Sequence, residues 1–191
     1  MLTHFPIHTI ATAPEESRPA LEQLQKEVGF LPNLAATMAE SPAMLRAFTT
    51  LRSIYAGTSF TGVEREVIAL TTSFENRCTY CVAAHSTFAA MQRAPEGVIE
   101  TLRAGGLPDD APRLAALSAI TRRLIETRGF VSEADLRSFA AAGFGRAQVL
   151  EALVGIATTS LANYMHNIGD CPLDAMFQAR AWIAPSAAPV S

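Results

Sequence analysis

The stretch Thr61–Ser86, TGVEREVIALTTSFENRCTYCVAAHS, predicts two consecutive helices. Thr61 and Glu64 have the spacing of a capping box, in which each side chain bonds the backbone N–H of the other residue. They open a helix that is expected to run to about Asn76. A second helix follows at once, with Asn76 as a suitable cap ahead of it, and it carries two of the chain's three cysteines.

The helical pattern extends along the whole chain. Apolar residues recur at intervals of three and four, strand-like alternation is scarce, and Gly and Pro fall mostly at the borders of these patterns. Further helices are expected over residues 18–28, within 30–40, and over 41–55, 94–105, 113–128, 132–143, 146–167 and 173–183. Ser132 with Asp135 is expected to cap the helix over 132–143. We therefore expect an all-α, single-domain helical bundle over residues 1–183, followed by a disordered tail at 184–191 with too little to bury.

Composition and charge limit the partners. A chain of 191 residues can form one domain that buries roughly 70% of its unfolded surface without disulfides. Its 49% hydrophobic and 17% charged residues leave little polar surface for a monomer, which favours burial between subunits of a homo-oligomer. The net charge of −3 and the scattered arginines argue against nucleic acid or an anionic membrane as a partner. A small molecule or a protein is expected instead.

Targeting signals and cysteine usage favour the cytoplasm. The N-terminal residues lack a basic region followed by an apolar core, as a secretory signal would have. The longest apolar run, Val149–Ala162, contains Glu151 and is shorter than the roughly 18 residues of a membrane span. Three cysteines, two of them close together, make a poor extracellular framework. In a reducing compartment a close pair indicates chemistry.

One internal similarity raises the possibility of a duplicated helical hairpin. A shift of 87 positions lays Thr71–Asn76, TTSFEN, on Thr158–Asn163, TTSLAN. A coincidence in an Ala- and Thr-rich helical chain explains the match as well as an ancestral repeat does. The second copy has Met165 and Ile168 at the positions of the two cysteines, so only the first copy carries thiols.

The spacing of Cys78, Cys81 and His85, at i, i+3 and i+7, is typical of one helix face and suggests a redox dithiol with its own base. The positive end of the helix favours a thiolate at Cys78. His85 lies one turn beyond Cys81 and favours that residue as the thiol that loses its proton. Glu66, on the preceding helix, either returns to the same pocket to orient His85 or complements its own helix dipole.

Other interpretations of the cysteines are weaker. A c-type haem site needs a histidine where this chain has Val82, and a thioredoxin domain needs alternating strands and helices. Zinc could bind the two cysteines and His85 with His166 or Cys171 as the fourth ligand, although structural zinc sites usually pair two knuckles. We expect no metal.

The remaining candidates are assigned no catalytic role. Cys171 is expected to be a small buried residue, and His4, His8 and His166 are expected to hydrogen-bond locally. No Gly-x-Gly-x-x-Gly fingerprint is present, so no nucleotide or flavin cofactor is expected. Electrons would come from a dithiol protein or a small thiol.

The segment EREVIALTTSFENRCTYCVAAHS, residues 64–86, resembles the core motif of the alkylhydroperoxidase D-like proteins of the carboxymuconolactone decarboxylase superfamily. GFLPNLAATMAESPAMLRAF, residues 29–48, is similar to the lead-in of the peroxidase-related members. GFGRAQVLEALVGIATTSLANYMHNIGDCPLD, residues 143–174, is similar to their second helical half. The similarity covers roughly residues 25–178.

This resemblance implies an all-helical fold assembled as trimers or hexamers, and thiol peroxidase activity. It implies that Cys81 attacks the peroxide, that Cys78 resolves the sulfenic acid as a disulfide, and that His85 and Glu66 form the proton relay. The best-known members carry a further histidine where this chain has Tyr80, and a phenol with a pKa of about 10 is no base at neutral pH.

Two alternative functions stay open at this point. One is a non-catalytic helical protein that binds a small ligand or zinc and keeps the dithiol as a redox sensor. The other, less favoured, is a lactone lyase like the decarboxylase branch, which lacks the cysteine pair.

Overall fold

The computed structural model of the chain describes residues 5–185, which form helices and loops without a β-strand. In chain order the elements are the 3₁₀-helix η1 (Glu15–Ser17), α1 (Arg18–Val28), α2 (Asn33–Met38), α3 (Pro42–Ala56), α4 (Gly62–Glu75), α5 (Thr79–Met91), α6 (Glu96–Arg103), α7 (Pro112–Glu126), α8 (Glu133–Ala141), α9 (Arg146–Gly169) and the 3₁₀-helix η2 (Ala175–Arg180). The prediction of an all-α single domain is confirmed. Within this range no single helix is both long and apolar enough to cross a membrane, and α8 and α9, bent by 103°, reach that length and apolarity only as a pair.

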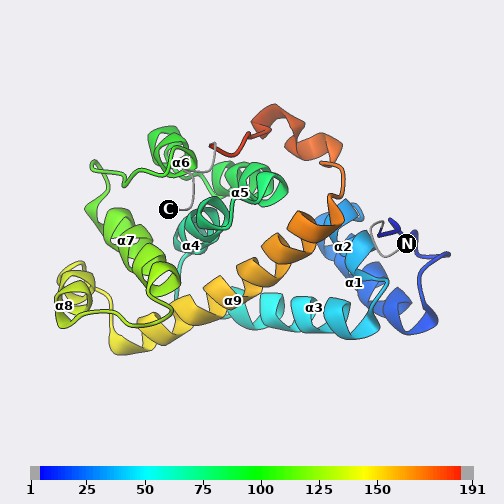
Figure 1. The fold of residues 1–191 in the computed structure, drawn as a ribbon, viewed down its shortest axis with the longest axis horizontal. Helices are drawn as coiled ribbons and strands as arrows, with labels where there is room; N and C mark the ends of the chain where they lie inside the picture. Colours follow the sequence, from blue (N-terminus) through cyan, green and yellow to red (C-terminus); the bar gives the residue numbers. More distant parts are fainter. Residues whose placement is uncertain (1–4, 186–191) are drawn as a thin grey trace, which may run out of the picture.

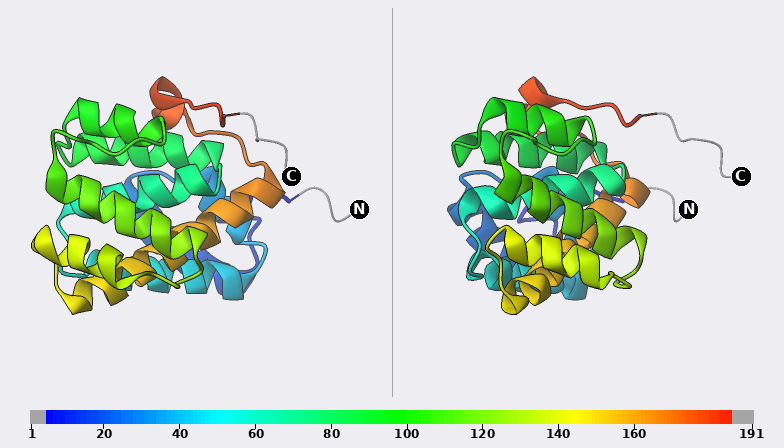
Figure 2. Two further views of the ribbon diagram at one scale, coloured as in Figure 1. Left: turned by 60° about the vertical axis from the view of Figure 1, so that its left-hand side comes forward. Right: turned by 90° about the vertical axis from the view of Figure 1, so that its left-hand side faces the viewer.

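Helix α4 occupies the centre of the molecule and packs against α5, α7 and α9. Helix α3 lies along α9, with α1 and α2 at one end of the molecule and α7 and α8 at the other (Figure 1). Turned views show α6, α5 and α4 layered one above another, and the C-terminal segment passing over them (Figure 2). The central position of α4 means that a side chain on it can meet partners from three other helices.

The apolar core consists of two clusters of buried side chains. One lies between α4, α6, α7 and α8, and includes large residues such as Ile99 and Phe139. The other contains all three cysteines together with residues of α1, α2 and α9. The thiols therefore lie in apolar surroundings, where charge is costly unless hydrogen bonds stabilise it.

Side-chain caps fix the starts of two helices as the sequence predicted. Thr61 and Glu64 form a complete capping box at α4, and Ser132 and Asp135 form another at α8. Glu64 is buried and also accepts a hydrogen bond from Arg113 of α7 at 2.8 Å. One carboxylate thus caps α4 and ties it to α7.

The helix predicted over residues 173–183 is wrong in length and type. The structure has only the short 3₁₀-helix η2 there, a form that is normally used in short pieces. This segment is held by contacts with α6: Arg180 bonds both carboxylate oxygens of Glu96 at 2.7 and 2.9 Å, and Trp182 donates to the Arg103 carbonyl at 3.0 Å. Of the tail predicted at 184–191, residues 186–191 lie outside the described residues.

The internal similarity has a counterpart in the contacts between α4 and α9. Asn163 donates to the Ser73 hydroxyl at 3.2 Å, and Asn76 donates to the Ser160 hydroxyl at 3.2 Å. These two contacts exchange under the shift of 87 positions, as expected for a two-fold relation. The copies also differ, because α4 ends near Arg77, whose φ is 54°, whereas α9 continues as one helix.

Candidate active site

The Cys-x-x-Cys pair lies at the start of α5. Cys78 is the N-cap residue, and its Sγ accepts a hydrogen bond from the backbone N–H of Cys81 at 3.3 Å. The cap expected from the sequence, Asn76, instead ends α4, because the left-handed conformation of Arg77 separates the two helices. Cys78 itself therefore takes the N-cap position, and its sulfur lies at the free N–H groups of the first turn of α5.

The two thiols have opposite electrostatic environments. Cys78 has none of its surface exposed and Cys81 only 2%. Hydrogen bonds from the Cys81 thiol, the Cys81 backbone and the Asn163 side chain outweigh burial and hold the pKa of Cys78 below its usual value. Burial, followed by the neighbouring Cys78, raises the pKa of Cys81 well above its usual value. The reduced pair therefore places its first negative charge on Cys78, with Cys81 as a thiol donating to it.

Glu66 of α4 and His85 of α5 lie side by side in the structure. Of the two roles that the sequence left open for Glu66, this contact agrees with the one in which Glu66 orients His85. The His85 Nδ1 atom lies 2.8 Å from Glu66 Oε2, and both side chains are half-buried. A proton on Nδ1 shared with the carboxylate leaves Nε2 as the basic nitrogen. The turn at Arg77 makes this possible, because it lets α5 pack beside α4.

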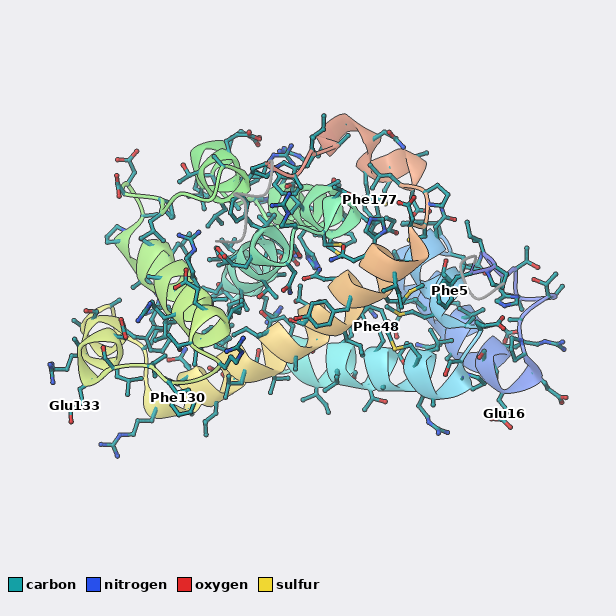
Figure 3. All side chains as sticks on the ribbon, viewed as in Figure 1. Phe5, Glu16, Phe48, Phe130, Glu133 and Phe177 are labelled. Carbon is teal, nitrogen blue, oxygen red and sulfur yellow. The ribbon has the colours of Figure 1, made fainter. Side chains whose placement is uncertain are left out.

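A cavity of about 440 Å³ joins three of the four predicted site residues. It is lined by Cys81, His85 and Glu66, but not by Cys78. Its walls are largely apolar, and the aromatic rings of Phe48 and Phe177, labelled in Figure 3, contribute to them with Leu34, Tyr55 and Phe88. Because Cys81 and His85 both line this cavity, a molecule that enters it can meet both side chains.

Asn163 of α9 is a functional candidate that sequence reasoning missed. Its side chain is fully buried, accepts from Asn76 at 3.0 Å, and is one of the groups that stabilise negative charge on Cys78. It thus connects the end of α4, the middle of α9 and the dithiol. The internal similarity, which aligns Asn163 with Asn76, was the signal that could have found it.

Tyr80 has a structural partner that the sequence did not suggest. Its hydroxyl donates to Asp174, which also accepts from the backbone N–H of Asn33 at 3.1 Å. Burial and the bond to Asp174 raise the pKa of Tyr80 far above its usual value, so the phenol ties α5 to the C-terminal segment and is not a base. Tyr80 and Asp174 are 94 positions apart, and no local pattern links them.

Cys171 and the two other described histidines, His8 and His166, lie outside this cavity. Cys171 is buried, and its Sγ lies 3.3 Å from His166 Nδ1, while His166 Nε2 lies 3.1 Å from the Thr79 hydroxyl. His8 bonds Glu40 at 2.7 Å, and His4 lies outside the described residues. Within residues 5–185, no three His, Cys, Asp or Glu side chains converge as a metal site requires, so the zinc set considered from the sequence is not assembled.

The fold and the site together define a class of protein. Its members are all-helical, carry a dithiol at the start of a helix, and have a Glu–His pair that lines one cavity with the second cysteine. Residues 42–123 match the model of the Carboxymuconolactone decarboxylase family. This match, together with the alkylhydroperoxidase-like structure described below, supports an assignment to the carboxymuconolactone decarboxylase superfamily. No protein with a curated description matches the sequence significantly.

Solved structures extend the similarity over nearly the whole chain. An alkylhydroperoxidase AhpD core, an uncharacterized peroxidase-related protein from Ralstonia eutropha JMP134, is 25% identical, with 93% of this chain and 95% of that chain covered and a TM-score of 0.80. A peroxidase-related protein from Silicibacter sp. TM1040 is 21% identical, with 92% and 93% covered and a TM-score of 0.76. The debrominase Bmp8, in complex with 2,3,4-tribromopyrrole, is 17% identical, with 87% and 89% covered and a TM-score of 0.70. The last two establish the fold alone.

Proposed function

We propose that this protein is a thiol-dependent peroxidase that reduces hydrogen peroxide or an alkyl hydroperoxide. The observation that carries the proposal is the content of the cavity: Cys81, His85 and Glu66 line it, and Cys78 does not. A peroxide that enters the cavity can reach the sulfur of Cys81 and the imidazole of His85 together. Cys78 has no exposed surface, which supports a role for it after this encounter.

The first step is attack by Cys81 on the peroxide. The proton of the Cys81 thiol passes to Nε2 of His85, while Glu66 holds the other ring nitrogen and stabilises the imidazolium. The sulfur then bonds the terminal peroxide oxygen, the O–O bond breaks, and His85 returns the proton to the departing alkoxide. The products are a sulfenic acid on Cys81 and one alcohol, or water when hydrogen peroxide is the substrate.

The second step is resolution by Cys78. Its lowered pKa keeps a thiolate next to Cys81, and attack of this thiolate on the sulfenic sulfur forms the disulfide and releases hydroxide, which becomes water. The helix start thus stabilises the thiolate that is needed second. A dithiol protein or a small thiol then restores the pair, and the reducing cytoplasm predicted as the location would supply such a donor.

We also infer that the protein works as a homo-oligomer, a trimer or a hexamer. Leu150, Leu153, Tyr164 and Ile168 are exposed on α9, and helical spacing places them on one face of it. Such a stripe is more typical of an interface than of a monomer surface. Sedimentation at micromolar concentration measures the assembly directly, and a single species near the chain mass of 20.4 kDa would contradict the inference.

Single-turnover experiments on two matched variants test the mechanism. Cys78→Ser should consume about one equivalent of peroxide and stop as a sulfenic acid, which a 1,3-dione probe traps and mass spectrometry locates at Cys81. Cys81→Ser should consume none. Retention of reactivity in Cys81→Ser together with its loss in Cys78→Ser would show that Cys78 is the attacking thiol and overturn the assignment.

Steady-state turnover separates the enzyme from the non-catalytic alternative. Hydrogen peroxide and an organic hydroperoxide should each be tested against a panel of protein dithiols and small thiols. A peroxidase consumes many equivalents with at least one donor. Stoichiometric oxidation of the dithiol without turnover by any donor would favour the redox sensor.

A further inference from the structure

The cavity that contains Cys81 and His85 is much larger than hydrogen peroxide requires. Its volume is about 440 Å³. A water molecule occupies about 30 Å³ of liquid, and hydrogen peroxide has only one more oxygen atom. Cavities of roughly 300–1,000 Å³ with mostly apolar walls are typical of sites that bind organic ligands. The size of the cavity therefore favours an organic hydroperoxide.

The cavity is also long, and it follows the two helices that carry the site. After the turn at the end of α4, α5 runs back along α4, and the contact between Glu66 and His85 sets their relative level. Gly62 lies four residues before Glu66, and Cys81 lies four residues before His85. At about 1.5 Å per residue, this separates Gly62 from Cys81 by roughly 12 Å along the helices. Both residues line the cavity, so it extends over about two helical turns.

The end of the cavity far from Cys81 opens to solvent. Met91 and Gln92, at the end of α5, line the cavity and are exposed, whereas Cys81 is buried. The Gln92 side chain packs over Gly62, so the ends of the two helices meet at this opening. The ring of Phe88 lies on α5 between the opening and Cys81 and belongs to the largely apolar wall. A ligand that fits this shape has an apolar chain inside and a polar end at the opening.

Arg65 is the one charged side chain of this cavity that has no partner of opposite charge within residues 5–185. Two other ionised pairs complete the lining. Arg52 pairs with Glu27 at 2.7 Å, and Glu66 lies 2.8 Å from His85. Arg65 forms no ion pair in this part of the chain, although it lies next to Glu66 in sequence. Its positive charge is therefore available to a ligand.

The position of Arg65 suits it to hold the polar end of a ligand. Arg65 is half-buried on α4, three residues after Gly62 and so on the same helix face. Within the described chain its side chain donates only to the backbone carbonyl of Phe60, just ahead of α4, which places the guanidinium at the opening and not at Cys81. A guanidinium has five N–H donors, so most of them are free. A half-buried cation is stabilised when an anion pairs with it.

The anion that fits best is a carboxylate. The planar guanidinium matches the two oxygens of a carboxylate, with two parallel hydrogen bonds. One guanidinium balances the single negative charge of a carboxylate, whereas a phosphate monoester carries nearly two. Arg52 does not supply the second positive charge, because Glu27 already neutralises it.

We propose that the substrate is an apolar organic hydroperoxide that carries a carboxylate at the end remote from its O–O group, and that Arg65 binds this carboxylate at the opening of the cavity. A chain of roughly ten C–C bonds spans the distance from Gly62 to Cys81, because each bond of about 1.5 Å is inclined to the chain axis. The proposal rests on the proposed peroxidase for the reaction. The hydroperoxide is reduced to a hydroxy acid and water, the two thiols are oxidised to the disulfide, and the carboxylate is unchanged.

The first test needs no peroxide. It uses 12-hydroxydodecanoate, the product expected from 12-hydroperoxydodecanoate, and the methyl ester of this hydroxy acid, which lacks the charge. Isothermal titration calorimetry of the reduced wild-type protein at low ionic strength should show that the acid binds about tenfold more tightly than the ester. Equal binding of the acid and the ester would overturn the proposal and leave the proposed peroxidase untouched.

Two variants assign this preference to Arg65. The preference for the acid should disappear in Arg65→Gln and should be partly retained in Arg65→Lys, which keeps the charge but not the planar fork. Arg46→Gln is the matched control, because Arg46 is exposed on α3 and does not line the cavity. It removes the same charge and should keep the preference. A preference for the acid that persists in Arg65→Gln would contradict the role of Arg65.

The second test measures turnover with dithiothreitol as the fixed thiol donor. The kcat/KM of wild-type protein for 12-hydroperoxydodecanoate should exceed those for its methyl ester and for hydrogen peroxide by about tenfold or more. The ratio of acid to ester should fall to about one in Arg65→Gln and stay unchanged in Arg46→Gln. A wild-type protein that favours the ester or hydrogen peroxide would contradict the proposal. A wild-type protein that consumes no peroxide with any donor would instead refute the peroxidase, and the binding experiment would still decide whether Arg65 holds a carboxylate.

Discussion

Gly155 allows the close approach of Tyr55 to α9, and Gly155→Ala is expected to destabilise the protein. A Cβ at position 155 would lie 2.7 Å from two ring carbons of Tyr55 and 2.8 Å from its hydroxyl oxygen. Ordinary carbon contacts need about 3.5–4.0 Å, so the buried ring must move by about 1 Å. That shift would strain the hydrogen bond from the Tyr55 hydroxyl to the Arg65 carbonyl, now 3.0 Å. Tyr55 also lines the cavity that contains Cys81 and His85, so the same change should reach the candidate site.

The expected loss in the free energy of unfolding of Gly155→Ala is the sum of three contributions. Overpacking costs about 1–3 kcal/mol, and a lost hydrogen bond adds about 1 kcal/mol. Replacing a helical glycine by alanine offsets about 1 kcal/mol, which leaves a net loss of about 1–3 kcal/mol. Gly97→Ala in α6 is the matched control: nothing lies within 4 Å of its Cβ, so only the gain of up to about 1 kcal/mol should appear.

Urea unfolding followed by circular dichroism, at one fixed protein concentration, measures both variants. The midpoint should fall for Gly155→Ala and rise for Gly97→Ala, with the slope of each transition unchanged. A Gly155→Ala protein as stable as Gly97→Ala would refute the packing argument.

Three further predictions concern charged and titrating groups. Hydrogen bonds to Glu64 outweigh the effect of burial and lower its pKa from 4.5, so its stabilisation is present above that pH and lost as the pH falls through the lowered value. Glu64→Gln should therefore cost about 1–3 kcal/mol in urea unfolding at pH 7 and less at pH 3, and an equal loss at both pH values would contradict this. His85→Ala should slow peroxide consumption about 10²- to 10⁴-fold with partial recovery at alkaline pH, and Glu66→Gln should do less, because the imidazole remains; the reverse order would exclude His85 as the base. Cys78→Ser should lower the pKa of Cys81, measured by the pH dependence of its alkylation, because it removes a neighbouring negative charge; a higher pKa would contradict the assignment of the first charge to Cys78.

Much of the fold could be predicted because its helix borders are marked by local chemistry. The helix expected over residues 18–28 has those bounds in the structure, and both capping boxes were visible as residue pairs. The start of α5 could not be predicted, because Arg77 adopts a left-handed conformation that usually marks Gly or Asn. The prediction of a helix over residues 173–183 was wrong for a different reason. The conformation of this segment depends on contacts with α6 and not on its own periodicity.

The candidate site was predictable where it rests on neighbouring helices. Two consecutive helices joined by a short turn must pack side by side, and this brings Glu66 to His85. Asn163 and Asp174 lie more than 80 positions from their partners Asn76 and Tyr80, and apart from the internal similarity that aligns Asn163 with Asn76 no pattern in the sequence links them. Side-chain partners of that kind are set by the packing of the whole chain.

The sequence left two thiols competing for the role of nucleophile, and the structure separates the two arguments by step. The helix start lowers the pKa of Cys78, but a sulfur without exposed surface cannot meet a peroxide, whatever its charge. Cys81 lines the cavity together with His85, and a positioned general base there can remove the proton that burial otherwise holds on the thiol. Access therefore favours Cys81 as the attacking thiol of the proposed reaction. In the proposed reaction a stable thiolate at Cys78 is useful afterwards, when it attacks the sulfenic acid on the neighbouring Cys81, a step that requires no contact with solvent.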